Sequence, residues 1–461
     1  MRGIYRLFLY RNGVEMIKYY EKRLQLENKI DFEDAANLYG DSEYCCLYEN
    51  GDEITVGVGA YSVIHVTQLE IIMDSPNESK RVKLESLCED MEKALGSIKL
   101  ADWRMYGIAN FAVSRYVYGL NTGKETGELF RFFIPQMEYR IKDNEITLRA
   151  MDQTRIPDME ALIQRSRRSN QITSSQRLID SGKVIQYDEE YYKDIVSKGI
   201  GDIKNGKYQK IILSRKIPLE HRLDMRETYI SGRNANTPAR SYLCRLQDFE
   251  VVGFSPETVA EVEKNRTVYT FPLAGTRALT SDSKLNKELK HQLLNDPKEI
   301  AEHAISVKLA FEEMEQVCEP SSVSVIDYMS VMERGTVQHL GSRLKGKLKD
   351  GYNSWHALCK LFPAVTASGI PKKEAIEAIG KLEKEARDLY SGSVLIYDSD
   401  GSMDAALVLR SIFQSKKESW VRVGAGIVEL SNPTREFIET QEKVSCIAKN
   451  LILEAQLVSS R

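Results

Sequence analysis

Residues 258–275, TVAEVEKNRTVYTFPLAG, contain two short runs rich in β-branched residues, separated by only a few polar residues. Such runs are typical of β-strands. Parallel neighbouring strands need a crossover of a dozen or more residues, so a link this short makes the two strands antiparallel. The stretch therefore predicts an α+β fold with large antiparallel sheets rather than a regular series of βαβ units.

The surrounding sequence alternates strands and helices irregularly. Residues 189–206 have a helical pattern that ends at Gly206, and residues 207–219 form a β-rich run that stops at Pro218. In the N-terminal part, residues 53–71 have a strand pattern and residues 80–98 a helical one. We expect further helices at 284–316, 327–334, 371–387 and 433–452, and further strands at 239–246, 250–254, 393–398, 404–413 and 420–429.

The composition excludes several classes of protein. The chain has 461 residues and a formal charge of −3, so no global positive field attracts nucleic acid or an anionic membrane. No window approaches the roughly 20 apolar residues of a membrane-spanning helix. The seven cysteines form no C-x-x-C pair, so neither structural zinc nor a disulfide framework is expected. These features favour a cytoplasmic protein.

Two pairs of glutamates share one spacing. NDPKEIAEHAISVK (295–308) contains Glu299 and Glu302, and PTREFIETQEK (433–443) contains Glu436 and Glu439. Residues three apart lie on one face of a helix. Each pair could be an exposed helix face, or the two pairs could form one acidic site. The small and apolar residues after Glu302 favour the second interpretation, and carboxylate oxygens are ligands that Mg²⁺ prefers.

Four other positions suggest chemistry or binding. Gly424 and Gly426 follow a strand but lack the third glycine of a dinucleotide fingerprint, so they favour close approach of bare backbone to an anion. Lys210, at the start of a β-run, either extends to water or, if it is buried, becomes a candidate general base. Glu257 follows Ser-Pro at a strand end, where a structural cap is the alternative to a catalytic role.

Several motifs occur in a fixed order and together resemble the chorismate-utilising enzymes, the family of anthranilate, isochorismate, aminodeoxychorismate and salicylate synthases. The motifs are LSRKIPL, GFSPE, PLAGTR, SKLNKELKHQLLNDPKEIAEH, VMERGTVQHLGS, FPAVTASGIPK, LYSGSV, DAALVLRS and VGAGIVELSNPTREFIETQEK. The resemblance covers roughly 190–455. It implies one large unit of two packed antiparallel sheets wrapped by helices, with a variable N-terminal half (1–185) and a chorismate-binding half (186–455).

Two residues and two motifs indicate the branch of this family. Ala274 stands where aminodeoxychorismate synthases have a lysine nucleophile. Lys210 stands where the ammonia-using anthranilate enzymes have a non-basic residue, so the resemblance implies water as the nucleophile and no glutamine amidotransferase subunit. FPAVTASGIPK and VQHLGS are most similar to the salicylate synthases of siderophore biosynthesis; an isochorismate synthase that releases its first product is the alternative. Phe271 departs from the acidic residue of several relatives.

The resemblance also implies roles for individual residues. Lys210 would be the general base and Glu257 the general acid. Mg²⁺ would be held by Glu302 and Glu439, with Glu299 and Glu436 acting directly or through water. The enzyme would be a monomer whose partner is the small molecule chorismate. The residues implied to bind substrate are Thr276, His339, Thr366, Tyr390, Arg410, Gly424, Gly426 and Lys443.

Overall fold

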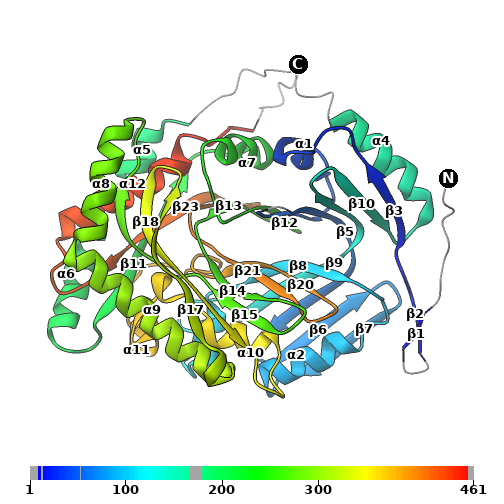
Figure 1. The fold of residues 1–461 in the computed structure, drawn as a ribbon, viewed down its shortest axis with the longest axis horizontal. Helices are drawn as coiled ribbons and strands as arrows, with labels where there is room; N and C mark the ends of the chain where they lie inside the picture. The colour runs from blue at the N-terminus through cyan, green and yellow to red at the C-terminus, as the bar shows by residue number, and fades with distance from the viewer. Residues whose placement is uncertain (1–8, 12–13, 52, 167–178, 455–461) are drawn as a thin grey trace.

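The computed structural model describes residues 9–11, 14–51, 53–166 and 179–454. Strands fill the middle of the molecule and the longer helices lie around its outside (Figure 1). The N-terminal strands are β1 (Leu9–Arg11), β2 (Val14–Met16), β3 (Tyr20–Gln25), β4 (Tyr44–Asn50), β5 (Glu53–Thr67), β6 (Glu70–Ser75), β7 (Glu78–Lys83), β8 (Arg104–Ala109), β9 (Glu128–Lys142) and β10 (Glu145–Ala150).

The C-terminal half contributes the larger number of strands. They are β11 (Lys210–Leu219), β12 (Arg240–Leu246), β13 (Phe249–Ser255), β14 (Thr258–Val262), β15 (Thr267–Thr270), β16 (Leu273–Ala278), β17 (Ser324–Arg334), β18 (Val337–Lys347), β19 (Gly369–Ile370), β20 (Ser393–Asp398), β21 (Met403–Leu407), β22 (Ser411–Ser415) and β23 (Ser419–Ile427).

The helices are spread along the whole described chain. They are α1 (Phe32–Ala36), α2 (Leu87–Gly96), α3 (Ala112–Val117), α4 (Ile156–Ser166), α5 (Ser181–Gln186), α6 (Glu189–Lys204), α7 (Met225–Asn234), α8 (Ser283–Asn295), α9 (Pro297–Val317), α10 (Ser354–Leu361), α11 (Lys372–Leu382) and α12 (Pro433–Ala448). Within the described ranges, no helix is long and apolar enough to span a membrane.

Strand pairing confirms the predicted α+β class with antiparallel sheets. β14 and β15, the two strands of the opening stretch, pair antiparallel with Glu261 opposite Tyr269. Antiparallel pairing joins β3 to β23 into one network that closes on itself. The two halves of the chain meet within this network, because β12 pairs with β4 and β20 pairs with β8.

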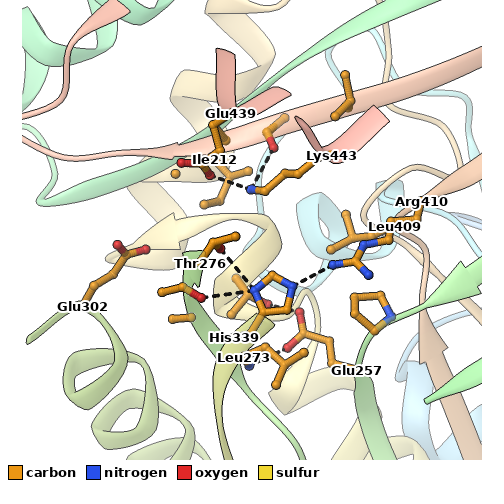
Figure 2. Close-up of a pocket in the computed structure, with 18 of the residues that line it drawn as sticks. Ile212, Glu257, Leu273, Thr276, Glu302, His339, Leu409, Arg410, Glu439 and Lys443 are labelled. Atoms are coloured by element: carbon orange, nitrogen blue, oxygen red, sulfur yellow. Dashed lines mark hydrogen bonds and ion pairs between the residues drawn. The ribbon is translucent and has the colours of Figure 1, made fainter. Parts of the chain in front are cut away.

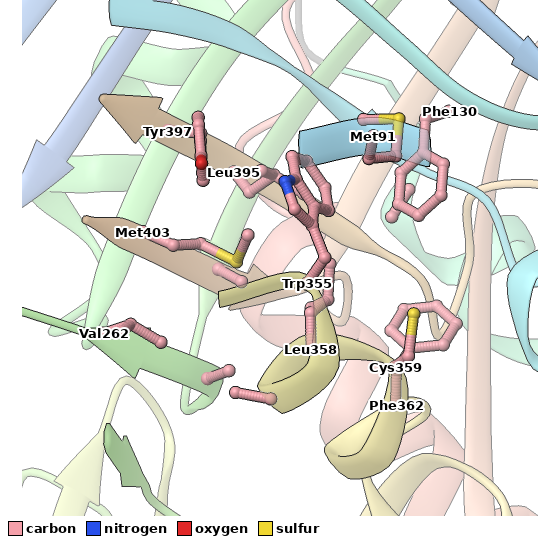
Figure 3. Close-up of a cluster of buried hydrophobic side chains, with 14 of the residues drawn as sticks. Met91, Phe130, Val262, Trp355, Leu358, Cys359, Phe362, Leu395, Tyr397 and Met403 are labelled. Carbon is pink, nitrogen blue, oxygen red and sulfur yellow. The ribbon is translucent and has the colours of Figure 1, made fainter. Parts of the chain in front are cut away.

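Trp355 is the centre of the largest hydrophobic core, which also joins the two halves (Figure 3). Its indole ring lies edge-on to Phe130 of β9, with ring centroids 5.7 Å apart, and 5.0 Å from the ring of Tyr397 in β20. Met91 of α2 packs in the same cluster. Such aromatic packing contributes beyond the buried area alone, so it stabilises the scaffold that carries the cavity described below.

Several element predictions are wrong in detail. Residues 327–334 are not a helix but part of strand β17, which pairs along β18; short apolar runs do not by themselves separate strand from helix. The expected helix 284–316 is two helices, since Asp296 ends α8 and caps α9 ahead of Pro297. The expected strand 404–413 breaks before Arg410, whose φ is 51°. The helix expected at 80–98 begins only at Leu87.

One disulfide also differs from the expectation. Cys46 of β4 is bonded to Cys244 of β12, although 198 residues separate them. The register of the two strands places these cysteines directly opposite each other. The spacing of the cysteines in the sequence could not predict this disulfide, because the two residues meet only through the pairing of β4 with β12.

Candidate active site

A cavity of about 110 Å³ lies among β11, β16, β18, β23, α9 and α12 (Figure 2). Of the residues predicted to act on or bind a ligand, all but Glu436 line it. Those that line it are Lys210, Glu257, Thr276, Glu299, Glu302, His339, Thr366, Tyr390, Arg410, Gly424, Gly426, Glu439 and Lys443. Positions spread over more than 230 residues of sequence therefore meet in one place, which makes this cavity the candidate active site.

Lys210 is the first residue of β11, and only 5% of it is exposed. Its side chain and that of Ile212 both line the cavity, as strand alternation predicts. Nζ donates to Oε1 of Glu302 at 2.7 Å. Burial raises the pKa of Glu302, but the neighbouring ammonium outweighs burial and holds that pKa below its ordinary value. The lysine is therefore buried and paired with a carboxylate rather than extended into water.

Glu257 lies between β13 and β14 and is 2% exposed. Oε1 accepts a hydrogen bond from Oγ1 of Thr366 at 2.5 Å, and Oε2 accepts one from the backbone N–H of Leu273 at 2.8 Å. Burial raises the pKa of Glu257 to about 7, against the opposing effects of these donors and of Arg410 and Lys210. A carboxyl group with such a pKa can carry and release a proton near neutral pH, as a general acid must.

Arg410 is half-buried in the wall of the cavity (Figure 2). Its Nη2 lies 2.7 Å from Nε2 of His339, and Nδ1 of that ring lies 3.1 Å from the carbonyl oxygen of Gly275. The carbonyl can only accept, so Nδ1 carries the hydrogen and Nε2 accepts from the guanidinium. Among the described residues, no carboxylate forms an ion pair with Arg410. A half-buried guanidinium that lines a cavity and has no carboxylate partner suits an anionic ligand.

The glycines of β23 leave room for the reactive side chains. A Cβ atom at Gly426 would lie 3.3 Å from Cε of Lys210 and 3.5 Å from Oε1 of Glu302. At Gly424 it would lie 2.5 Å from the carbonyl oxygen of Leu213 on the paired strand β11. The expectation of bare backbone beside a ligand fits this geometry, since both glycines line the cavity.

Each glutamate pair begins in the first turn of its helix, with Glu299 in α9 and Glu436 in α12, and its second member lies one turn further on. Asp296 caps α9 and Asn432 caps α12, and each cap is followed by a proline at the first helical position. These residues are typical of helix starts. Because the N-terminus of a helix carries partial positive charge, it favours carboxylates in the first turn. The sequence thus presents the two acidic pairs at the ends of two helices that face one cavity.

Most of these glutamates are neutralised by basic side chains. Glu299 accepts from Nη1 of Arg277 at 2.9 Å, and Oε1 of Glu439 lies 2.7 Å from Nζ of Lys443. Glu436 is the exception, because it is buried and has Glu439 as a close acidic neighbour. Burial and, secondarily, the charge of Glu439 raise the pKa of Glu436 to about 7.

The carboxylates of the predicted metal site are donors that suit Mg²⁺, but in the described residues they are not gathered around one point. Across the described ranges, no three histidine, cysteine, aspartate or glutamate side chains come close enough together to hold a metal ion. Glu302 and Glu439 nevertheless line the same cavity, and the charge of Glu439 adds to burial in raising the pKa of Glu436. A hard divalent cation with oxygen ligands would fit these residues.

Two basic residues of the cavity were absent from the sequence prediction. Arg422 lines the cavity from β23, and Lys298 lines it from α9. Arg422 has the same parity along its strand as Gly424 and Gly426, so strand alternation places all three on one face and is the signal that could have identified it. Lys298 directly precedes Glu299 in the first turn of α9, where nothing but the fold distinguishes it from a solvated lysine.

Comparison with known proteins adds an independent line of evidence. Residues 43–449 match the family described as chorismate binding enzyme. A salicylate synthase of Mycolicibacterium paratuberculosis is 37% identical over 410 residues, which cover 88% of this chain and 89% of that protein. An anthranilate synthase component 1 of Thermococcus kodakarensis is 36% identical over 297 residues, covering 64% of this chain and 67% of that protein.

Solved structures share the fold. The menaquinone-specific isochorismate synthase of Escherichia coli aligns with a TM-score of 0.72 at 18% identity and covers 94% of each chain. Anthranilate synthase component I of Streptococcus pneumoniae aligns with a TM-score of 0.70 at 22% identity, covering 86% of this chain and 92% of that one. At such identities the likeness concerns the fold alone.

Proposed function

The chain belongs to the family of chorismate binding enzymes, and from this premise we propose that it is a salicylate synthase. The enzyme adds water to chorismate to form isochorismate and then eliminates pyruvate to leave salicylate, which would serve siderophore biosynthesis. The proposal goes beyond the coarser conclusion, that the protein is an enzyme acting on chorismate, by naming the nucleophile and the final product.

The observation that carries the proposal is the pairing of Lys210 and Glu257 in one cavity. A buried lysine and a carboxyl group with a pKa of about 7 are the base and acid that an exchange of hydroxyl groups on a ring requires. Lys210 would take a proton from the water that attacks C2 of chorismate. Glu257 would give a proton to the C4 hydroxyl as it leaves as water. One molecule of water enters and one leaves, so the step is an isomerisation.

Substrate binding would use the cationic groups of the cavity. The enolpyruvyl carboxylate would lie against Arg410 and Tyr390, with the backbone near Gly424 and Gly426. Lys443, half-buried beside Glu439, would add positive charge near the ring carboxylate. A bound Mg²⁺, held by Glu302 and Glu439 with Glu299 and Glu436 close by, would supply the charge that lets this carboxylate approach the glutamates. His339 and the hydroxyl groups of Thr276 and Thr366 would line the ring pocket.

The second step would depend on shape more than on a new base. The hydrogen on C2 moves to the methylene carbon of the enolpyruvyl group while the C3–O bond breaks, which releases pyruvate and leaves the aromatic ring. Such an intramolecular rearrangement is accelerated mainly by holding the reacting atoms in the reactive geometry. Three side chains in the wall of the cavity support this role, because His339 is hydrogen-bonded to both Arg410 and Thr276. These bonds fix the orientation of the side chains that the substrate would meet.

Sequence similarity supports the choice among family members. The relative named salicylate synthase is 37% identical over 88% of this chain, whereas an anthranilate synthase component 1 of Methanothermobacter marburgensis, which matches over 95% of it, is 28% identical. The residue at position 210 points the same way, since a lysine favours activation of water over use of ammonia.

Product analysis tests the proposal. Purified protein is incubated with chorismate and Mg²⁺, and the products are separated by chromatography, with pyruvate measured by a coupled assay. We expect salicylate and pyruvate in equal amounts. Isochorismate without pyruvate would show an isochorismate synthase instead, and anthranilate formed with ammonium salts would contradict the assignment of water as nucleophile.

A further inference from the structure

A buried ion cluster lies directly behind the cavity. It consists of Glu383, which follows α11, Arg387, four residues further along the same connection, and Arg422 of β23. Their side chains are 1%, 0% and 2% exposed. Two guanidinium groups share one carboxylate, so the cluster retains a net positive charge inside the protein. Burying three charges is costly unless their geometry is specific, which raises the question of what the cluster does.

Glu383 holds the cluster together. Its Oε1 accepts from Nη2 of Arg387 at 2.6 Å, and its Oε2 accepts from Nε of Arg387 at 3.0 Å and from Nη2 of Arg422 at 2.6 Å. The bond to Arg387 is therefore bidentate, the arrangement that fixes a guanidinium most firmly. The backbone N–H of Ser214 in β11 donates to the same Oε1 at 2.8 Å.

The remaining donors of Arg387 reach both catalytic segments. Nη2 donates to the carbonyl oxygen of Ile212 at 2.7 Å, and Nη1 donates to the carbonyl oxygen of Ala367 at 2.7 Å. Ile212 follows Lys210 by two residues in β11. Ala367 follows Thr366, whose hydroxyl group donates to Glu257. One guanidinium thus joins the strand of the base to the loop that holds the acid.

Few other direct backbone bonds join these two segments. β11 and β19 pair only at Lys210 with Ile370 and at Ile211 with Gly369, and the N–H of Ile212 donates to the carbonyl oxygen of Ser368 at 2.8 Å. The Arg387 contacts extend this connection past the end of the short ladder, to the residue beside Thr366. Lysine could not replace them, because a single ammonium cannot match the planar fork that bonds the carboxylate and two carbonyls together.

Arg422 shares the carboxylate but not these contacts. Its Nε donates to Oγ of Ser214 at 2.9 Å and its Nη2 to the carbonyl oxygen of Glu385 at 3.3 Å. Unlike Arg387, it lines the cavity. The cluster therefore contains two arginines with the same buried partner, of which one touches the backbone of both catalytic segments and the other faces the ligand.

We propose that Arg387, held by Glu383, is a positioning residue that sets the separation of Lys210 and Glu257, an inference that rests on the base and acid roles proposed above. Arg387 touches neither substrate nor reacting atoms. It acts by holding the carbonyls of Ile212 and Ala367 at one guanidinium, so the base and the acid keep the geometry that water addition needs. Arg422 instead adds positive charge at the wall of the cavity.

Matched lysine variants separate the two arginines. Arg387→Lys and Arg422→Lys both keep the charge and both disturb the bond to Glu383. We expect Arg387→Lys to lower kcat about 100-fold with little change in KM, the cost of a small misplacement of catalytic groups. We expect Arg422→Lys to raise KM instead. Equal losses of kcat in the two variants, or an unchanged kcat in Arg387→Lys, would overturn the proposal.

A pH profile gives a second readout that general loss of stability would not change. The groups facing Glu257 are the Thr366 hydroxyl, the Leu273 N–H, Arg410 and Lys210, and the bond from Thr366 lowers its pKa. When the loop beside Ala367 loosens, that bond weakens and the pKa of the acid rises. The basic limb of kcat/KM in Arg387→Lys should therefore move to higher pH, and a limb that stays in place would contradict the positioning role.

Two further measures keep the test decisive. If Arg387→Lys does not fold, Glu383→Asp is the milder variant, since it keeps the carboxylate charge and both carbonyl contacts but weakens the bidentate bond by shortening the side chain; a smaller fall in kcat supports the proposal and none contradicts it. Rates are followed as loss of chorismate, whatever product forms. A wild-type enzyme that yields only isochorismate would therefore refute the proposed function while leaving the comparison of variants intact.

Discussion

The two sides of the cavity are built in different ways. On the acid side, strands and loops hold two hydrogen-bonded pairs, Thr366 with Glu257 and Arg410 with His339. On the glutamate side, helices α9 and α12 present carboxylates that are paired with basic groups, as Glu302 is with Lys210. On the first side the hydrogen bonds are already formed without a ligand. On the second side a metal ion and substrate would have to replace the basic partners of the carboxylates.

This difference shows how one site can combine rigidity with exchangeable charge. The acid needs a fixed environment, because its pKa depends on burial and on a few oriented donors. The glutamates need partners that can leave, since a metal ion binds only where carboxylate oxygens become available. Lys210 belongs to both sides, because it pairs with Glu302 while it also lowers the pKa of Glu257.

The largest effect is expected where the two sides meet. Lys210→Ala removes the base, so formation of isochorismate should fall by about 10²–10⁴-fold, the usual contribution of a general base. Initial rates of chorismate loss at saturating Mg²⁺ measure this effect. Lys216→Ala is the matched control, because Lys216 lies on the same strand and pairs with the surface residue Glu418. A variant lacking Lys210 that keeps its activity would refute its role.

The glutamate side should respond to metal concentration. Glu439→Gln removes a proposed ligand, so the affinity for Mg²⁺ should fall about 10–100-fold, a loss known for residues that support metal sites. Calorimetric titration with Mg²⁺ measures this without relying on turnover. Glu442→Gln, on the same helix but paired with the surface residue Arg435, should bind as the wild type does. Equal affinities for Mg²⁺ in the two variants would show that Glu439 of α12 is not a metal ligand.

The acid side should respond to pH. Because the Thr366 hydroxyl lowers the pKa of Glu257, Thr366→Val should raise that pKa from about 7 by roughly one unit, the value of one hydrogen bond to a charged group. The acid must be protonated to act, so activity is lost as pH rises through this pKa. The basic limb of kcat/KM should therefore shift to higher pH, and a shift to lower pH would contradict the assignment.

The smallest effect is expected at Gly426. In Gly426→Ala the new Cβ would lie 3.3 Å from Cε of Lys210 and from Cδ1 of Ile212. Both atoms are at the ends of flexible side chains, so they can move by a few tenths of an ångström. We expect a fall of only a few-fold in kcat/KM with unchanged thermal stability. A loss as large as that of Lys210→Ala would show that the backbone here has a further role.

Local sequence predicted the parts of the site that local chemistry determines. The caps ahead of the glutamate pairs, the strand that begins at Lys210 and the antiparallel pair in 258–275 all follow from neighbouring residues. The resemblance to a family predicted that these parts meet in one site. The cavity does bring together all the predicted residues except Glu436.

Contacts between residues far apart in the sequence could not be predicted from local sequence. The helix predicted at 327–334 is a strand because it pairs with β18. Cys46 meets Cys244 only through the register of β4 and β12. Arg387 looks like any charged residue after a helix, and its importance lies in carbonyls that are 175 and 20 residues away in sequence.

The origin of the product's hydroxyl oxygen tests the central claim most directly. The reaction is run with chorismate in ¹⁸O-labelled water, and salicylate is analysed by mass spectrometry. If Lys210 activates water for attack on C2, each salicylate molecule should carry one heavy oxygen in its phenolic hydroxyl group. Salicylate without the label would contradict water addition at this site.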